Sequence, residues 1–416
     1  MFRLIFKSAF FHVINMLVMI LTSVILAREL GVQLYGEYVI ILSIVTLVSI
    51  PISAGMPTLI VREGAKYSGL LQYDKLKGLL FTTRDLVSYY ISIIILALIF
   101  YSYIVKVEWL FLIALLLPVF SIVKLNSAFL RSQEHIVAGQ LLEIFPTLTW
   151  LFMLVLSTTA FNLTLSVELV VYEFVISQLI SIIVGSFYTY RRFTPLIRDV
   201  SASFEKNNWY RGLAPLTLYS GLNVLNGQVG IIVLGGISLN EVSYFKVAMS
   251  SAALVTFGLA AVNIVMGPKI SKLYSKGNKI EIQKMITNCS QLVLLVGCCI
   301  FIVFFVFASN LIGFFYGPEY LQATSSFKIL LFGNLVNAAL GSVVLILNMT
   351  RNEKVVVKGL FLAIFINLIL CLTLVQLYGA VGVAIAATLS MSFWNVYLAI
   401  MVFNKTGFIS HAFRKK

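Results

Sequence analysis

The chain alternates between long apolar stretches and short polar breaks from one end to the other. A helix needs about 20 mostly apolar residues to cross roughly 30 Å of hydrocarbon, so each long stretch predicts a membrane span. The expected spans of the first half are 9–28, 38–60, 85–105, 109–130, 136–160 and 169–190. Those of the second half are 212–236, 242–267, 286–308, 326–349, 356–377 and 381–403. The pattern therefore predicts an all-α polytopic membrane protein with twelve transmembrane helices.

Six spans in each half predict two six-helix bundles, at 1–190 and 212–416, joined by a cytoplasmic linker at 191–211. A shift of about 207 residues, half of the chain, superimposes 34–38 on 241–245. Residue identity is sparse, so hydropathy and loop charge carry this repeat. An even number of spans per half makes the two halves parallel repeats, and such halves can rock about a central cavity.

Two inner loops of the repeat, 69–82 and 270–286, mix Leu or Ile with Lys and Tyr. A helix lying in the membrane interface has this composition. A solvated basic loop has it too, and the sequence leaves both interpretations open.

Charge gives the orientation of the spans. Only 11% of the residues are charged, yet the formal net charge is +14. The basic residues lie in short segments between apolar stretches and form no patch large enough for nucleic acid, so we expect no nucleic-acid partner. With the N-terminus placed inside, 26 of the 30 Lys and Arg residues fall on the cytoplasmic side, as the positive-inside rule requires. Both termini are therefore predicted to be cytoplasmic, and four cations fall outside this trend, namely Arg28, Lys106, Lys246 and Lys328.

Polar side chains recur at helical spacing inside several spans. The tenth carries Asn334, Asn337, Gly341 and Asn348. Such stripes line a hydrated cavity, or they connect helices by hydrogen bonds. Because stripes occur in both halves, we favour a cavity. The residues that we expect to face the substrate are Asn15, Asn223, Asn226 and Asn337.

Charged residues within the spans are fewer. Arg28 and Lys246 lie near outer ends, where a cation either binds an anion or anchors the interface. Glu143 is deep in an apolar stretch, so it is a candidate for binding a coupling ion, or it is a neutral acid at a helix contact. The three histidines are isolated and have no metal-ligand spacing. We therefore expect no metal and no cofactor.

Several short motifs recur in order along the chain. They are ARELG at 27–31, YGEY at 35–38, GMP at 55–57, VREGA at 61–65, PKISKLY at 268–274, YGPEY at 316–320 and YGAVG at 378–382. In order and spacing the chain resembles the polysaccharide-transporter branch of the multidrug/oligosaccharidyl-lipid/polysaccharide flippase superfamily. Within that branch its size and layout are most similar to a Wzx-type O-antigen repeat-unit flippase.

The resemblance implies a bacterial inner-membrane protein that moves an undecaprenyl-diphosphate-linked oligosaccharide from the cytoplasmic to the periplasmic leaflet by alternating access. It also implies two bundles arranged as a V, and possible partners in the O-antigen polymerase and the chain-length regulator. Flippases of this superfamily use cavity cations on the first, second and eighth spans. The nearest candidates here are Arg28, Arg62 and Lys246, although Arg28 lies at the outer end of its span and Arg62 at the inner end.

Two other functions remain open. A drug or small-solute antiporter of the same superfamily would depend on a deep carboxylate such as Glu143. A membrane-embedded polysaccharide polymerase or glycosyltransferase would need clustered acids and bases in a loop, but the longest outer loop, near 308–325, holds one acid and no His. We therefore expect a transporter rather than an enzyme.

Overall fold

The computed structural model describes residues 2–105, 109–256, 259, 262–263, 266–267, 269–270, 273–274 and 278–412. These residues form helices and connecting turns, and they include no β-strand. The prediction of an all-α protein is therefore confirmed.

Several helices of the first half extend beyond the predicted spans. They are α1 (Phe2–Val48), the π-helical turn η1 (Pro51–Gly55), α2 (Met56–Gly69), α3 (Tyr73–Val105), α4 (Trp109–Ser132), α5 (Ile136–Thr159) and α6 (Val167–Ile197). Those of the second half are α7 (Lys206–Gly235), α8 (Leu239–Ala252), η2 (Ala253–Thr256), α10 (Lys279–Val306), α11 (Ala308–Tyr316), η3 (Pro318–Tyr320), α12 (Ala323–Leu340), α13 (Val343–Met349) and α14 (Glu353–Thr406).

Two of these helices contain a sharp break at a glycine with positive φ. The breaks are at Gly31 in α1 (φ 71°) and at Gly379 in α14 (φ 50°), so each helix covers more than one predicted span. Conversely, the tenth span consists of α12 and α13, which meet at an angle of 41°. Within the described residues, each of the twelve predicted spans thus corresponds to a helix, part of one, or consecutive helices. The protein is a multi-pass α-helical membrane protein.

The predicted inner loop at 69–82 is neither a separate interfacial helix nor a solvated loop. Helix α3 already begins at Tyr73, and Leu76 and Leu79, one helical turn apart, are completely buried. Their burial against Trp209 extends the helix far beyond its apolar span, and hydropathy alone does not reveal this extension. The matching segment 270–286 lies partly outside the described residues, and α10 begins there at Lys279.

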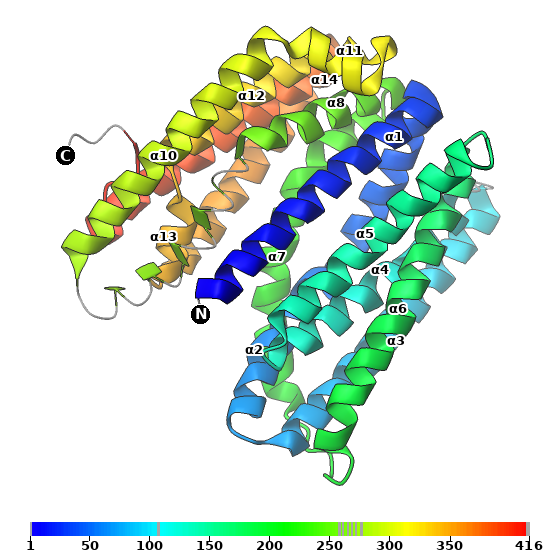
Figure 1. The fold of residues 1–416 in the computed structure, drawn as a ribbon, viewed down its shortest axis with the longest axis vertical. Helices are drawn as coiled ribbons and strands as arrows, with labels where there is room; N and C mark the ends of the chain where they lie inside the picture. The colour runs from blue at the N-terminus through cyan, green and yellow to red at the C-terminus, as the bar shows by residue number, and fades with distance from the viewer. Residues whose placement is uncertain are drawn as a thin grey trace. The chain divides into compact units, whose positions relative to one another are not determined.

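The chain forms two compact units. The N-terminal unit consists of residues 14–19 and 41–224, and the C-terminal unit of residues 20–40 and 225–412 together with the start of α1. In the N-terminal unit α4 packs against α2, α3, α5 and α6; in the C-terminal unit α12 packs against α8, α10 and α14 (Figure 1). Since α4 is the fourth span and α12 part of the tenth, the central helix has the same place in each half of the predicted repeat. The bundle boundaries at 190 and 212 stay a prediction.

Candidate functional site

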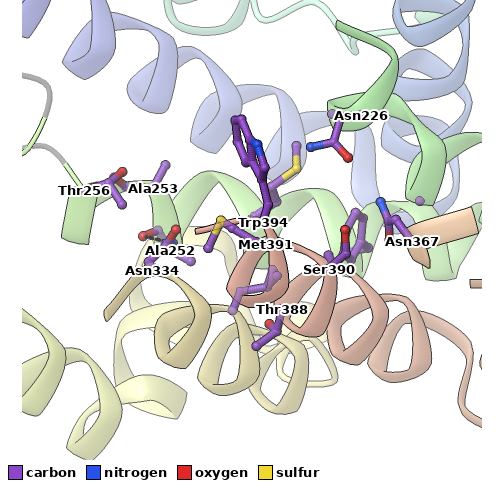
Figure 2. Close-up of a pocket in the computed structure, with 16 residues that line it drawn as sticks. Asn226, Ala252, Ala253, Thr256, Asn334, Asn367, Thr388, Ser390, Met391 and Trp394 are labelled. Carbon is purple, nitrogen blue, oxygen red and sulfur yellow. Dashed lines mark hydrogen bonds between the residues drawn. The ribbon is translucent and has the colours of Figure 1, made fainter. Parts of the chain in front are cut away.

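The C-terminal unit contains a cavity of about 230 Å³, between α7, α8, η2, α12 and α14. Figure 2 shows its walls, with Trp394 between Asn334 on one side and Asn226 and Asn367 on the other. The polar residues around it are Asn226, Thr256, Asn334, Asn367, Thr388, Ser390 and Trp394. The remaining walls are apolar or glycine. No acidic or basic side chain is among the described residues that line the cavity.

The break at Gly379 explains how one helix supplies two walls. Asn367 precedes the break and Ser390 follows it, and Ser390 Oγ donates a hydrogen bond of 2.7 Å to the carbonyl oxygen of Ala363. The two halves of α14 therefore lie side by side. Glu241 of α8 stabilises the break, because its carboxylate accepts a 2.5 Å hydrogen bond from the backbone N–H of Ala380. That N–H begins the second half of the helix and lacks an intrahelical partner.

Helix α7 lies close against the cavity because it carries glycine where it meets its neighbours. A Cβ atom at Gly230 would lie 2.5 Å from Val383 and 3.1 Å from Phe245, distances that leave no room for a side chain. The missing side chain lets α7 approach α8 and α14 and brings Asn226 to the cavity wall.

Most polar groups of the cavity wall are bound to the backbone. Asn334 Nδ2 donates to the carbonyl oxygen of Ala252 at 2.8 Å, and Thr388 Oγ1 donates to that of Ile329 at 3.1 Å. Two groups differ: Asn226 Oδ1 and Trp394 Nε1 are buried and have no hydrogen-bond partner among the described residues. Since buried polar groups are nearly always paired, these two indicate a site for water or a ligand.

Of the four predicted asparagines, the structure places Asn226 at this cavity. Asn337 of α12 is absent from the cavity wall, which is lined instead by Asn334, one turn earlier. Asn223 is exposed and donates to the carbonyl oxygen of Tyr219, on its own helix, at 3.0 Å. Asn15 belongs to the N-terminal unit, where its Oδ1 is buried without a partner among the described residues.

The predicted cations do not gather at the cavity. The guanidinium of Arg28, an exposed residue, donates to the carbonyl oxygens of Phe314 and Phe315 at the end of α11. Arg62 belongs to the N-terminal unit, where its side chain is 50% exposed and forms a 2.9 Å ion pair with Glu63. Lys246 lies half-buried on α8, and it has no ion pair or hydrogen bond with the part of the chain that is described. Their role in substrate binding stays a prediction.

The predicted coupling residue Glu143 is engaged in a polar network of the N-terminal unit. Its Oε1 accepts hydrogen bonds from Ser127 at 2.8 Å and from Arg131 at 2.7 Å. The carboxylate thus forms a partly exposed ion pair rather than standing alone in an apolar environment. Whether it binds a coupling ion stays a prediction.

Two of the sequence motifs meet in a cluster of tyrosines at one end of the C-terminal unit. Its members are Tyr35, Tyr38, Tyr244, Tyr316 and Tyr320, all of them buried. Tyr320 donates a 2.8 Å hydrogen bond to the carbonyl oxygen of Ala27, and its ring lies 6.4 Å from that of Tyr35. Burial raises the pKa of Tyr316 and of Tyr320 above the ordinary tyrosine value, so both hydroxyls are neutral. The tyrosines of the YGEY and YGPEY motifs therefore contribute packing and neutral hydrogen bonds.

Sequence reasoning missed Asn367, Ser390 and Trp394. Each lies in a long apolar stretch of α14, where a lone polar residue is the only available signal. Helical spacing could not connect Asn367 with Ser390, because the chain reverses between them.

Three comparisons relate this architecture to known proteins. The family model described as polysaccharide biosynthesis protein matches residues 25–325, more than half of the chain. An uncharacterised membrane protein of Methanocaldococcus jannaschii is 23% identical over 218 residues, which cover 51% of this chain and 43% of that protein. The chain thus spans less than half the length of this curated relative.

Solved structures show the same fold. The lipid II flippase MurJ, in an inward closed conformation, has a TM-score of 0.71 and 17% identity over 95% of this chain and 87% of its own. An inward-facing multidrug resistance transporter of the MATE family has a TM-score of 0.72 and 12% identity over 94% and 96%. The chain therefore belongs to the polysaccharide biosynthesis protein family, and it has the fold shared by this flippase and this multidrug transporter.

Proposed function

We propose that this protein is a flippase that moves undecaprenyl-diphosphate-linked O-antigen repeat units from the cytoplasmic to the periplasmic leaflet by alternating access. The observation that carries the proposal is the match to the polysaccharide biosynthesis family over residues 25–325. The fold shared with a lipid II flippase supports it, because lipid II is the substrate in that protein's name. The proposal includes a bacterial inner membrane and cytoplasmic termini.

Physical chemistry supports a polar path through the protein for the head group and a path through the lipid for the tail. A diphosphate-linked glycan cannot cross hydrocarbon without a polar path, since moving charged groups into lipid is strongly unfavourable. The polyprenyl tail can stay in the lipid throughout. Polar residues inside both halves, and cations such as Lys246, would line the path. The O-antigen polymerase and the chain-length regulator are the proposed partners.

The second candidate is a cation-coupled drug or small-solute antiporter. The multidrug transporter structure with a TM-score of 0.72 favours it on fold alone. Glu143 would then be the coupling residue, but its carboxylate is already paired with Arg131. A polymerase or glycosyltransferase is less favoured, since the longest predicted outer loop, near 308–325, holds one acid and no His.

Reconstitution into vesicles tests the proposal. An undecaprenyl-diphosphate oligosaccharide with a fluorescent sugar would be placed in both leaflets, and an impermeant glycosidase would cleave the outer pool. The proposal expects the protein to expose the inner pool to cleavage, while empty vesicles leave it protected. Protein vesicles that leave it protected, yet export a cationic dye under a proton gradient, would instead favour the antiporter.

A further inference from the structure

We propose that the cavity of the C-terminal unit binds one uncharged sugar ring of the lipid-linked oligosaccharide. This inference rests on the proposed function, which supplies the glycan, and it adds a site and a substrate class. Its basis is the pair of buried groups without partners, Asn226 Oδ1 on α7 and Trp394 Nε1 on α14, which line the same cavity.

The hydrogen-bonding groups match a ligand that both donates and accepts. Trp394 Nε1 can only donate, whereas Asn226 Oδ1 can only accept. The side-chain nitrogens of Asn226 and Asn367 add donors that no described residue uses. A sugar hydroxyl is both donor and acceptor, so adjacent hydroxyls of one ring can satisfy all of these groups. An apolar ligand would leave them unsatisfied.

The absence of charge excludes the diphosphate from this cavity. An anion removed from water needs cationic partners, and a cation needs carboxylates. Neither is present among the described lining residues, which offer amides, hydroxyls and one indole. The cavity therefore suits a neutral group, and the diphosphate must be held elsewhere.

The size favours a single ring. The volume of about 230 Å³ lies below the range of roughly 300–1,000 Å³ typical of pockets for drug-sized ligands. At about 30 Å³ each, seven or so water molecules would fill it. One ring can displace them, but an oligosaccharide cannot fit.

The apolar walls match the other face of a sugar. Phe245, Met249 and Met391 line the cavity together with the indole of Trp394. Aromatic and thioether groups pack well against the C–H face of a pyranose, which is apolar, while its hydroxyls point outward. The same cavity thus offers polar and apolar surface to one ring.

Glycoside binding to the purified full chain tests the inference. The probes are the methyl glycosides of glucose, galactose and N-acetylglucosamine, with glucuronate as the anionic counterpart. Two readouts are recorded, tryptophan fluorescence and the thermal unfolding midpoint, which a ligand of the folded state raises. We expect at least one neutral glycoside to change both, and glucuronate to bind at least about tenfold more weakly.

Variants locate the binding. Trp394→Phe should abolish the fluorescence change while the midpoint still reports weakened binding. Asn226→Leu should weaken binding about fivefold, the effect of about one hydrogen bond. Thr388→Val should do the same, because Thr388 Oγ1 donates its proton to Ile329 and its lone pairs can still accept from a sugar hydroxyl in the cavity. The matched control is Thr373→Val on the same helix, because Thr373 is exposed and its hydroxyl donates to its own helix backbone, to Ile369 at 3.0 Å.

Three results would overturn the site: no neutral glycoside binds, glucuronate binds as tightly, or Asn226→Leu and Thr388→Val bind like the wild type. The outcome is separable from that of the proposed function, since binding in detergent needs no transport. Glycoside binding at the cavity without flipping in vesicles would refute the flippase and leave the site. Flipping by a protein that binds no glycoside would refute the site and leave the flippase.

Discussion

Arg28 Nε donates a 2.6 Å hydrogen bond to the carbonyl oxygen of Phe315, in the last turn of α11. The carbonyl groups at a helix C-terminus have no intrahelical partner, and a cation there also meets the negative end of the helix dipole. Arg28, one of the four cations against the predicted positive-inside trend, thus has a structural role in the C-terminal unit. Its fixed position leaves the remaining N–H groups of the guanidinium for an anion.

The first prediction separates the capping of α11 by Arg28 from the binding of an anion by Arg28. Arg28→Ala should lower the stability of the purified protein by about 0.3–1 kcal/mol, because the helix end loses its cap. Arg28→Lys keeps the charge but loses the planar fork, so it should recover part of the flipping rate and little of the stability. Thermal unfolding and vesicle flipping measure the two effects. Wild-type stability of the Arg28→Ala variant would show that Arg28 does not stabilise the end of α11.

The second prediction concerns Glu205, which precedes α7 and binds the start of α3 in the N-terminal unit. Its carboxylate forms a 2.6 Å ion pair with Lys75 and accepts a hydrogen bond from Tyr67 at 3.2 Å. The hydrogen bond from Lys75, followed by that from Asn208, lowers the pKa of Glu205. Glu205→Gln should therefore lower the unfolding midpoint at pH 7 by roughly 1 °C, since a loss of about 1 kcal/mol shifts the midpoint of a chain of this length by that amount.

The sign of the pH dependence follows from the lowered pKa. The ionised carboxylate stabilises the fold fully above its unfolded pKa of about 4.3, and this contribution is lost as the pH falls through the lower folded value. The difference between wild type and Glu205→Gln should thus be constant from about pH 7 to 5 and shrink below about pH 4. A difference that grows on acidification would refute it. Glu134→Gln, at the exposed turn between α4 and α5, is the control.

The third prediction concerns Glu143 and its partner Arg131, which are 2.7 Å apart with side chains 35% and 31% exposed. Glu143→Gln leaves Arg131 unpaired, so stability should fall by about 1 kcal/mol. Adding Arg131→Met should restore it. If Glu143 also binds the coupling proton, an imposed pH gradient will not change the transport rate of the single or the double variant. A double variant that regains the wild-type response would leave Glu143 a purely structural role.

Much of the fold could be read from the sequence, because lipid enforces long apolar helices. The number and order of the spans follow from hydropathy, and the break at Gly379 lies between two predicted spans. The extension of α3 at its N-terminal end could not be predicted, since it depends on packing against Trp209, which is distant in the sequence. The candidate site was predicted only in part. Asn226 belonged to a visible stripe, but Asn367 and Trp394 reach the same cavity through a reversal of the chain that periodicity does not encode.

The fourth prediction is the topology. Reporter fusions after Asn162, Ser238 and Glu319 should report the periplasm, and fusions after Asp199 and Glu353 the cytoplasm. Four of these sites lie in connecting segments or at helix ends, and Glu319 lies in the short helix η3. Lys106, another outer-loop site, lies outside the described residues. One reversed site between two spans would require a missing or extra span and would contradict the twelve-span arrangement.

The last prediction concerns Lys246, a half-buried cation of α8 that has no ion pair or hydrogen bond with the described residues. An unpaired, half-buried ammonium is unfavourable unless an anion neutralises it, and a diphosphate brings charges that it can bind. Lys246→Gln should therefore slow flipping about tenfold, as expected for the loss of one charge-assisted hydrogen bond of about 1.5 kcal/mol, at unchanged membrane abundance. Lys246→Arg should keep most of the rate.

Lys328→Gln is the matched control, since Lys328 is also a cation against the positive-inside trend, but its Nζ lies 5.1 Å from the centre of the Phe305 ring. That contact gives Lys328 a partner of its own, so its variant should flip at the wild-type rate. Equal rates for Lys246→Gln and Lys328→Gln would show that Lys246 is an interfacial anchor, and the diphosphate would then have to be bound by Arg62 or the free donors of Arg28.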